Sequence, residues 1–272
     1  MNISYRPPAT HFSKGRHILA LLLMYLSFSA LFAAQPFSAR AYLVSYPQSV
    51  VTSVKEPLTW EAQDWLKAGA VLAVSTALYF TEEEIRDWAM DQQSSWMDDA
   101  ADVFRQPGEV LIMLPATALT ALGGYLWQDP HTMDTGLLSF KSLFLAAAAT
   151  GTLQFLSQKP RPEDGMGNQF HKGSGFKWNR DSFPSGHATV VWSIAPILSH
   201  QYPHQKWLPP LVYSIATLTS LSRIYEDKHW SSDVFTGAVI GWLSARLTLK
   251  STPTAYLAPT ASGRGIVLGF EF

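Results

Sequence analysis

The sequence predicts an all-α fold, a six-helix bundle with its chemically active residues on loops at one end. Two observations support this fold class. Six apolar segments are long enough to form helices, and clusters of Pro and Gly separate several of them, as at Gln128-Asp129-Pro130 and Pro203. Apolar helices in series favour a bundle. The six expected helices are Asp64–Phe80, Glu109–Trp127, Leu137–Ser157, Ala188–His200, Trp207–Ile224 and Val234–Leu249.

Three segments depart from this pattern. Residues 81–109 carry nine acidic residues against Arg86 and Arg105, which indicates a solvated surface segment, partly helical. Residues 158–186 are rich in Pro, Gly, Lys and Arg and form a long loop, a kind of segment that is often functional. Residues 251–272 are expected to form a tail or a short β-hairpin, because two apolar stretches flank Ala-Ser-Gly-Arg-Gly.

The N-terminus has the layout of a secretory signal peptide. Lys14 and Arg16 precede an apolar run from Ile18 to Ala34, and Ala39-Arg40-Ala41 offers a small-x-small cleavage pattern. The same layout suits an uncleaved signal anchor. We therefore expect residues 1–41 to be a signal peptide, 42–60 a lead-in segment and 61–250 the helical bundle. The protein is then exported to the cell envelope.

Whether the bundle crosses a membrane stays open at this level. If all six helices crossed, the signal peptide would place the acidic segment 81–109 in the cytoplasm, where loops normally carry excess Lys and Arg. The opposite orientation conflicts with the signal peptide and leaves residues 128–135 without Lys or Arg. A periplasmic protein removes both conflicts, and a membrane protein with a periplasm-facing site is the alternative.

Composition narrows the chemistry. Apolar residues make up 47% of the 272 residues and charged residues only 15%, so the chain buries much surface or contacts lipid. A net charge of −1 gives no basic field for nucleic acid. Because the chain has no cysteine, disulfides, thiolate nucleophiles and Cys-ligated metal sites are excluded.

Three short runs carry groups that suit an anionic phosphate. Arg161 and Arg223 are permanently charged forks that can bind it bidentately. Pro184-Ser185-Gly186-His187 opens the fourth helix, where Ser185 can cap it, Gly186 lets the backbone approach an oxyanion, and free N–H groups point outward.

The imidazoles supply the reactive groups. If His229 and Asp233 lie on one helical turn, four residues apart, Asp233 can accept from one imidazole nitrogen and leave the other free to attack. His187 is a second imidazole, able to protonate a leaving oxygen.

Two other readings of these residues are weaker. A serine hydrolase is disfavoured because no Gly-x-Ser-x-Gly elbow and no alternation of strands and helices occurs. A zinc site from His187, His229 and Asp233 is disfavoured because two arginines nearby would repel a dication. We expect no metal and no cofactor.

The three runs resemble the signature of the type 2 phosphatidic acid phosphatase superfamily, which also holds bacterial acid phosphatases and vanadium haloperoxidases. Its pattern is Lys-x6-Arg-Pro, Pro-Ser-Gly-His and Ser-Arg-x5-His-x3-Asp, and residues 184–187 and 222–233 match the second and third in full. The resemblance implies His229 as nucleophile, Asp233 as its orienter and His187 as general acid. It implies a phosphate cradle from Arg161, Ser185, Gly186 and Arg223.

One position departs from the family pattern, because Gln154 stands where the family has Lys. Lys159 is a candidate replacement for that charge. The expected activity is hydrolysis of a phosphate monoester or pyrophosphate, with a phosphorylated lipid or a small phosphate ester as substrate and membrane contact. The alternatives are a vanadium-dependent haloperoxidase and a non-catalytic envelope protein that retains the phosphate site.

Overall fold

The computed structural model describes residues 39–171, 181–251, 254–259 and 266–271. The expected signal peptide therefore falls almost wholly outside the described residues. The helical prediction is confirmed in its class, but the described residues form eight α-helices instead of six. They are α2 (Ala39–Lys55), α3 (Ala62–Asp91), α4 (Ser95–Arg105), α5 (Val110–Leu126), α6 (Pro130–Ser157), α7 (Gly186–Gln201), α8 (Leu208–Tyr225) and α9 (Ser231–Ser251).

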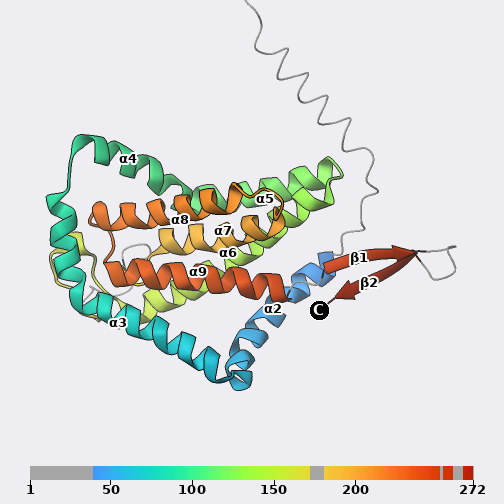
Figure 1. Ribbon diagram of the computed structural model, residues 1–272, viewed down its shortest axis with the longest axis horizontal. Helices are drawn as coiled ribbons and strands as arrows, with labels where there is room; N and C mark the ends of the chain where they lie inside the picture. The colour runs from blue at the N-terminus through green and yellow to red at the C-terminus, as the bar shows by residue number, and fades with distance from the viewer. Residues whose placement is uncertain (1–38, 172–180, 252–253, 260–265, 272) are drawn as a thin grey trace, which may run out of the picture.

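Shorter elements connect these helices. Three 3₁₀ turns lie at Glu56–Thr59 (η2), Gln106–Gly108 (η3) and Pro162–Asp164 (η4). Two antiparallel strands, β1 (Thr254–Pro259) and β2 (Ile266–Glu271), project from the end of the bundle beyond α9 (Figure 1).

The two helices beyond the six expected come from segments read as polar. Residues 42–60 form most of α2 together with η2, and the acidic segment contains the end of α3 and all of α4. α4 is amphipathic: Ala101 is buried, and Thr219 of α8 donates to the carbonyl oxygen of Phe104 at 2.6 Å. The nine acidic residues of the segment suggested a solvated surface, and the periodic apolar positions of α4 were therefore overlooked.

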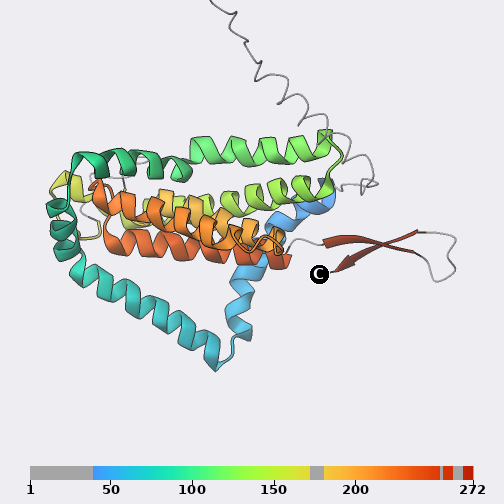
Figure 2. The ribbon, with the colours of Figure 1, turned by 45° about the horizontal axis from the view of Figure 1, so that its top comes forward.

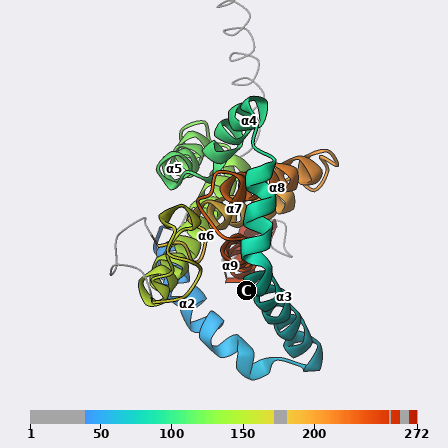
Figure 3. The same cartoon turned by 90° about the vertical axis from the view of Figure 1, so that its left-hand side faces the viewer.

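Helix α7 lies at the centre of the bundle, between α6, α8 and α9 (Figures 1 and 3). It shares one apolar cluster with α8 and another with α6. The cluster with α8 consists of Val191, Ala195, Val212 and Ala216. The cluster with α6 consists of Leu143, Val190 and Ile194. The central helix therefore holds its first turn, at Gly186 and His187, in a fixed position.

Two glycines allow α9 to pack directly against α7. A Cβ at Gly237 would lie 2.4 Å from the carbonyl oxygen of Ser185, and one at Gly241 would lie 2.4 Å from that of Thr189. Neither distance is possible for real atoms, so only glycine permits this approach. The close crossing brings the start of α9, with Asp233, beside the start of α7.

Helix α3 runs along the bundle only near its own C-terminal end and diverges from it towards α2 (Figure 2). Much of its apolar surface is exposed, as is that of α5. Large exposed side chains on these two helices are Trp65, Leu66, Leu72, Phe80, Trp88, Leu111, Ile112, Leu119, Leu122 and Leu126. So many large exposed apolar side chains indicate contact with another apolar phase or partner.

In the described part of the chain, one helical stretch, Pro130–Asp164, is long and apolar enough to cross a membrane. A second candidate is the pair Ser95–Gly108 and Val110–Leu126, which meets the criterion only jointly and is bent by 49°.

Candidate phosphate site

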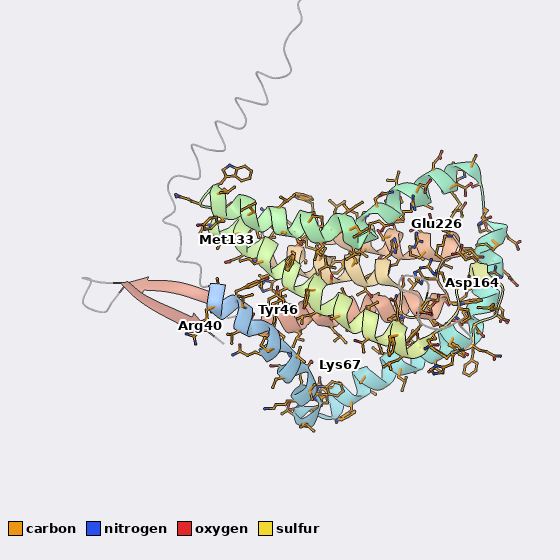
Figure 4. All side chains as sticks on the ribbon, turned by 180° about the vertical axis from the view of Figure 1, so that it is seen from behind. Arg40, Tyr46, Lys67, Met133, Asp164 and Glu226 are labelled. Atoms are coloured by element: carbon orange, nitrogen blue, oxygen red, sulfur yellow. The ribbon has the colours of Figure 1, made fainter. Side chains whose placement is uncertain are left out.

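The loop between α6 and α7 and the loop between α8 and α9 meet at one end of the bundle, and together they carry the three sequence motifs. Hydrogen bonds tie them together: the Ser182 amide donates to the Lys159 carbonyl at 2.8 Å, and the Ser185 amide donates to the Asp233 carbonyl at 3.0 Å. The Trp230 indole donates to the Pro160 carbonyl at 3.0 Å. Figure 4 places Asp164 and Glu226, which follow Arg161 and Arg223 by three residues, at this end, and Arg40 and Met133 at the other.

His229 is buried, and its tautomer follows from its contact. Its Nδ1 lies 2.8 Å from the carbonyl oxygen of Ser182. Because a carbonyl oxygen only accepts, Nδ1 carries the proton and Nε2 keeps its lone pair. Burial, with the charges of Arg161 and Arg223, holds the pKa of His229 well below its ordinary value. The imidazole is therefore neutral and has one nucleophilic nitrogen.

Asp233 supports His229 by a route that differs from the expected one. No hydrogen bond joins these two side chains; instead the Asp233 carboxylate accepts from the Ser182 hydroxyl and from the Trp230 amide, the latter at 2.9 Å. Asp233 thus fixes Ser182, whose carbonyl fixes His229. The direct contact was expected on one helical turn, but α9 begins only at Ser231, so His229 lies before that turn.

A buried lysine completes this arrangement. The Lys159 ammonium group contacts Asp233 at 2.8 Å and Glu82 of α3 at 2.9 Å, and all three side chains are fully buried. It also donates to the Ser232 hydroxyl at 3.1 Å. A buried cation needs such partners. The expectation that Lys159 replaces the missing family lysine in the phosphate cradle is therefore wrong, because two carboxylates already hold it.

Gln154 does not replace that lysine either. Its side-chain amide donates to the carbonyl oxygen of Pro184 at 3.0 Å, at the start of the Pro-Ser-Gly-His run. Gln154 thus braces the loop that leads into α7. The two cations of the predicted cradle are Arg161 and Arg223.

Arg223 is almost buried, and its Nη1 pairs with the carboxylate of Glu226. Burial lowers the pKa of Arg223, and Arg161 acts in the same direction while Glu226 opposes it. The Nη1 of Arg161 lies 3.6 Å from a Glu163 oxygen. The Nε atom of Arg223 is buried and has no hydrogen-bond partner among the described residues. It is a donor available to an oxyanion.

The first turn of α7 adds backbone donors. The Ser185 side chain accepts from the Ala188 amide at 3.5 Å and caps the helix. A Cβ at Gly186 would meet nothing within 4 Å, so there is open space in front of this residue. The amides of Gly186 and His187 belong to the first turn, where N–H groups lack helical acceptors and favour an anion.

His187 has a partner that the sequence did not single out. Its Nε2 lies 3.1 Å from the Oε1 oxygen of Glu109, the residue at the N-cap position of α5. Burial, with the charges of Arg223 and Arg161, lowers the pKa of His187 to about 4, and Glu109 acts in the opposite direction. Glu109 is one of nine acids in the segment 81–109, and nothing in its spacing distinguishes it.

The acidic segment also holds the loop between α8 and α9. Arg86 binds Asp227 bidentately, with nitrogen–oxygen distances of 2.6 and 2.7 Å. Tyr225 donates to Asp98 at 2.6 Å, and Lys228 pairs with Glu163 of η4. These contacts fix the loop that carries His229. Over the ranges that the structure describes, no group of three or more His, Asp or Glu side chains is placed to hold a metal ion.

Comparison with known proteins supports the motif analysis. Residues 136–256 match the family model described as the PAP2 superfamily. The lipid A 1-phosphatase of Porphyromonas gingivalis is 32% identical over 81 residues, 29% of this chain and 18% of that protein. An undecaprenyl-diphosphatase of Sulfolobus acidocaldarius is 38% identical over 64 residues, 23% of this chain and 30% of that protein. These alignments span less than a third of either curated relative.

A solved structure is similar in fold. It is that of a transmembrane PAP2-type phosphatidylglycerolphosphate phosphatase from Bacillus subtilis, with a TM-score of 0.53 and 23% identity. The superposition covers 66% of this chain and 93% of that one. The matched family region contains all three motifs, and their loops meet at one end of a helical bundle. Residues 136–256 of this chain are therefore similar to the PAP2 superfamily in sequence, and the bundle is similar in fold to a PAP2-type phosphatase.

Proposed function

We propose that this chain is a metal-independent phosphatase that hydrolyses a phosphate monoester or pyrophosphate of a lipid through a phosphohistidine on His229. The observation that carries the proposal is the state of this imidazole: Nδ1–H is held by the Ser182 carbonyl, and Nε2 has a free lone pair. A neutral, oriented imidazole beside two guanidinium groups is suited to attack on phosphorus.

The mechanism assigns a task to each residue. Arg161, Arg223 and the amides at the start of α7 hold the phosphate oxygens. His229 Nε2 forms a bond to phosphorus while the bond to the leaving oxygen breaks, and His187 gives that oxygen a proton. Water then attacks phosphorus, the P–N bond breaks, and His187 takes the proton from water. Asp233 positions His229 through Ser182.

A lipid substrate is supported by the surface of the molecule and by the relatives. Exposed apolar side chains cover much of α3 and α5. The two curated relatives are named for lipid A and for an undecaprenyl diphosphate, which are both phosphorylated lipids. We further propose that the protein is associated with the cell envelope, with its site facing the periplasm and reached from the membrane surface.

A haloperoxidase is the weaker alternative. Such an enzyme holds vanadate by charge, and here Gln154 and Lys159 are engaged with Pro184 and with two carboxylates. Two arginines alone then supply the positive charge. Halogenation that requires vanadate, bromide and peroxide would favour this alternative.

The test is an assay of membrane and soluble fractions for phosphate release from phosphatidate and from a soluble aryl phosphate. The proposal predicts release that resists EDTA and is inhibited by vanadate. His229→Ala should lower turnover at least about 10³-fold, since the covalent route is lost. His200→Ala, at an exposed histidine in α7, is the matched control and should retain full activity. EDTA-sensitive release, or an active His229→Ala protein, would contradict the mechanism.

A further inference from the structure

The segment just before α5 contributes to the candidate site although it lies outside the matched family region. η3 ends at Gly108, and Glu109 directly precedes α5, whereas the family match begins at residue 136. Glu109 brings a carboxylate oxygen to 3.1 Å from His187 Nε2. The mechanism as proposed gives Glu109 no task, so its contact with the general acid calls for an explanation.

The backbone of η3 at Gly108 packs directly against the His187 side chain. A Cβ on Gly108 would lie 2.7 Å from His187 Cβ, 2.8 Å from its Cδ2 and 2.9 Å from Thr219 Cγ2. The His187 ring therefore packs with its Cδ2 and Nε2 edge towards Gly108 and Glu109. Thr219 holds the preceding backbone by donating to the Phe104 carbonyl.

This geometry determines which nitrogen of His187 exchanges a proton. An ionised carboxylate accepts only, so Nε2 carries hydrogen in both the neutral and the charged ring. Nδ1, on the other edge, is then the nitrogen that gains and loses the proton. We infer that Glu109 is a positioning residue for the general acid: it fixes the Nε2–H tautomer of His187 and stabilises its imidazolium form. This inference rests on the phosphatase function proposed above.

The charges around His187 explain why such a residue is needed. From α8 and from the loop after α6, Arg223 and Arg161 face it, and both disfavour a charged ring. His229, on the loop before α9, is neutral by the argument above. Glu109 is thus the group that opposes the two arginines. Without it, the imidazolium that must protonate the leaving oxygen would be present in a smaller fraction of molecules.

The first experiment measures the titration of His187 and does not depend on turnover. In the full chain in detergent, NMR of labelled histidine should show that Glu109→Gln lowers the pKa of His187, while Glu109→Asp restores it in part. Glu84→Gln, at an exposed acid of the same segment, is the matched control and should leave the titration unchanged. An unchanged pKa in Glu109→Gln would overturn the inference.

The second experiment uses the leaving group. An alkyl phosphate needs protonation of its leaving oxygen more than an aryl phosphate does. Glu109→Gln should therefore lower kcat for phosphatidate about 10- to 100-fold, lower it less for an aryl phosphate, and move the alkaline limb of the pH profile to lower pH. Gly108→Ala, which must displace His187, should lower kcat for both substrates.

The outcomes separate the two proposals. A wild-type chain with no turnover of either substrate contradicts the phosphatase function itself. An active wild type with equal losses on both substrates in Glu109→Gln, or with an unshifted pH profile, contradicts only the role of Glu109.

Discussion

Among the residues that the structure describes, two lysines are fully buried, one towards each end of the bundle, and their surroundings differ. Lys159, at the site end, contacts the carboxylates of Glu82 and Asp233. Lys141, in α6, donates to the hydroxyls of Ser45 in α2 and Ser251 in α9, at 2.9 and 3.2 Å. The first lysine belongs to a charged network that reaches His229 through Asp233 and Ser182. The second ties α2, α6 and α9 together through its hydrogen bonds to these two hydroxyls.

The difference shows how charge is used to build a site. Hydroxyl groups can re-form hydrogen bonds with one another when a cation is removed, as the Ser49–Ser251 contact of 2.6 Å already indicates. Buried carboxylates cannot, because each carries a charge that needs a counter-ion. The site end is therefore held in one geometry by charges that must remain paired, whereas the opposite end tolerates change.

Replacement of each of the two lysines should give the largest difference in the free energy of unfolding. Lys159→Met leaves two carboxylates buried without their cation, so we expect it to lower the free energy of unfolding by about 3–5 kcal/mol. Lys141→Met removes hydrogen bonds, but it also removes the unfavourable desolvation of a buried charge. It should therefore lower the free energy of unfolding by about 1 kcal/mol or less. Denaturant unfolding in detergent measures both. Equal losses would show that the two environments do not differ in this way.

The pH dependence of stability tests the partly buried imidazole of His187 at the site end. An unfolded histidine titrates near pH 6.5, whereas His187 has a pKa of about 4 in the folded chain. Between these values the unfolded chain binds more protons, so stability is lost as the pH falls from 6.5 towards 4. For His187 this slope is at most about 1.4 kcal/mol per pH unit.

The variant His187→Asn should therefore flatten the dependence of unfolding free energy on pH in that window. His200→Asn, at an exposed histidine, serves as the comparison and should leave the slope as it is. If His187→Asn kept the wild-type slope, the imidazole would not be buried in its neutral form.

Ion pairs nearer the surface should give the smallest differences in stability and turnover. Arg86 and Asp227 form a half-buried bidentate pair that holds the loop before His229. Arg86→Ala should cost about 1 kcal/mol and lower turnover a few-fold. Lys67→Ala, which breaks an exposed pair with Asp64 in α3, should cost about 0.5 kcal/mol or less and leave turnover unchanged. Thermal unfolding and the phosphatidate assay measure the two effects, and similar turnover in both variants would contradict the role of the loop.

The sequence predicted the helical class and the loops that meet at the site, because these depend on apolar segments and on short motifs. It did not predict Glu82, Glu109 or Ser182. These residues act through contacts with partners 47 to 78 positions away, and local spacing carries no information on such contacts. The two acids were also indistinguishable from seven others in the same segment.

The two errors about the site have physical causes. The Asp233–His229 contact was expected from helical spacing, but the helix begins two residues after His229. Lys159 was expected to reach the phosphate because its neighbouring prolines end α6. In the fold, the close packing of α3 and α9 brings two carboxylates to it first.

The proposed mechanism requires a covalent bond between His229 Nε2 and phosphorus. Rapid quenching of the purified chain with labelled phosphatidate, followed by peptide mapping, would detect this bond. We predict an acid-labile, alkali-stable phosphoryl group on the peptide that contains His229, present in wild type and absent in His229→Ala. Turnover without any labelled peptide, or with the label on a Ser or Asp side chain, would contradict the account.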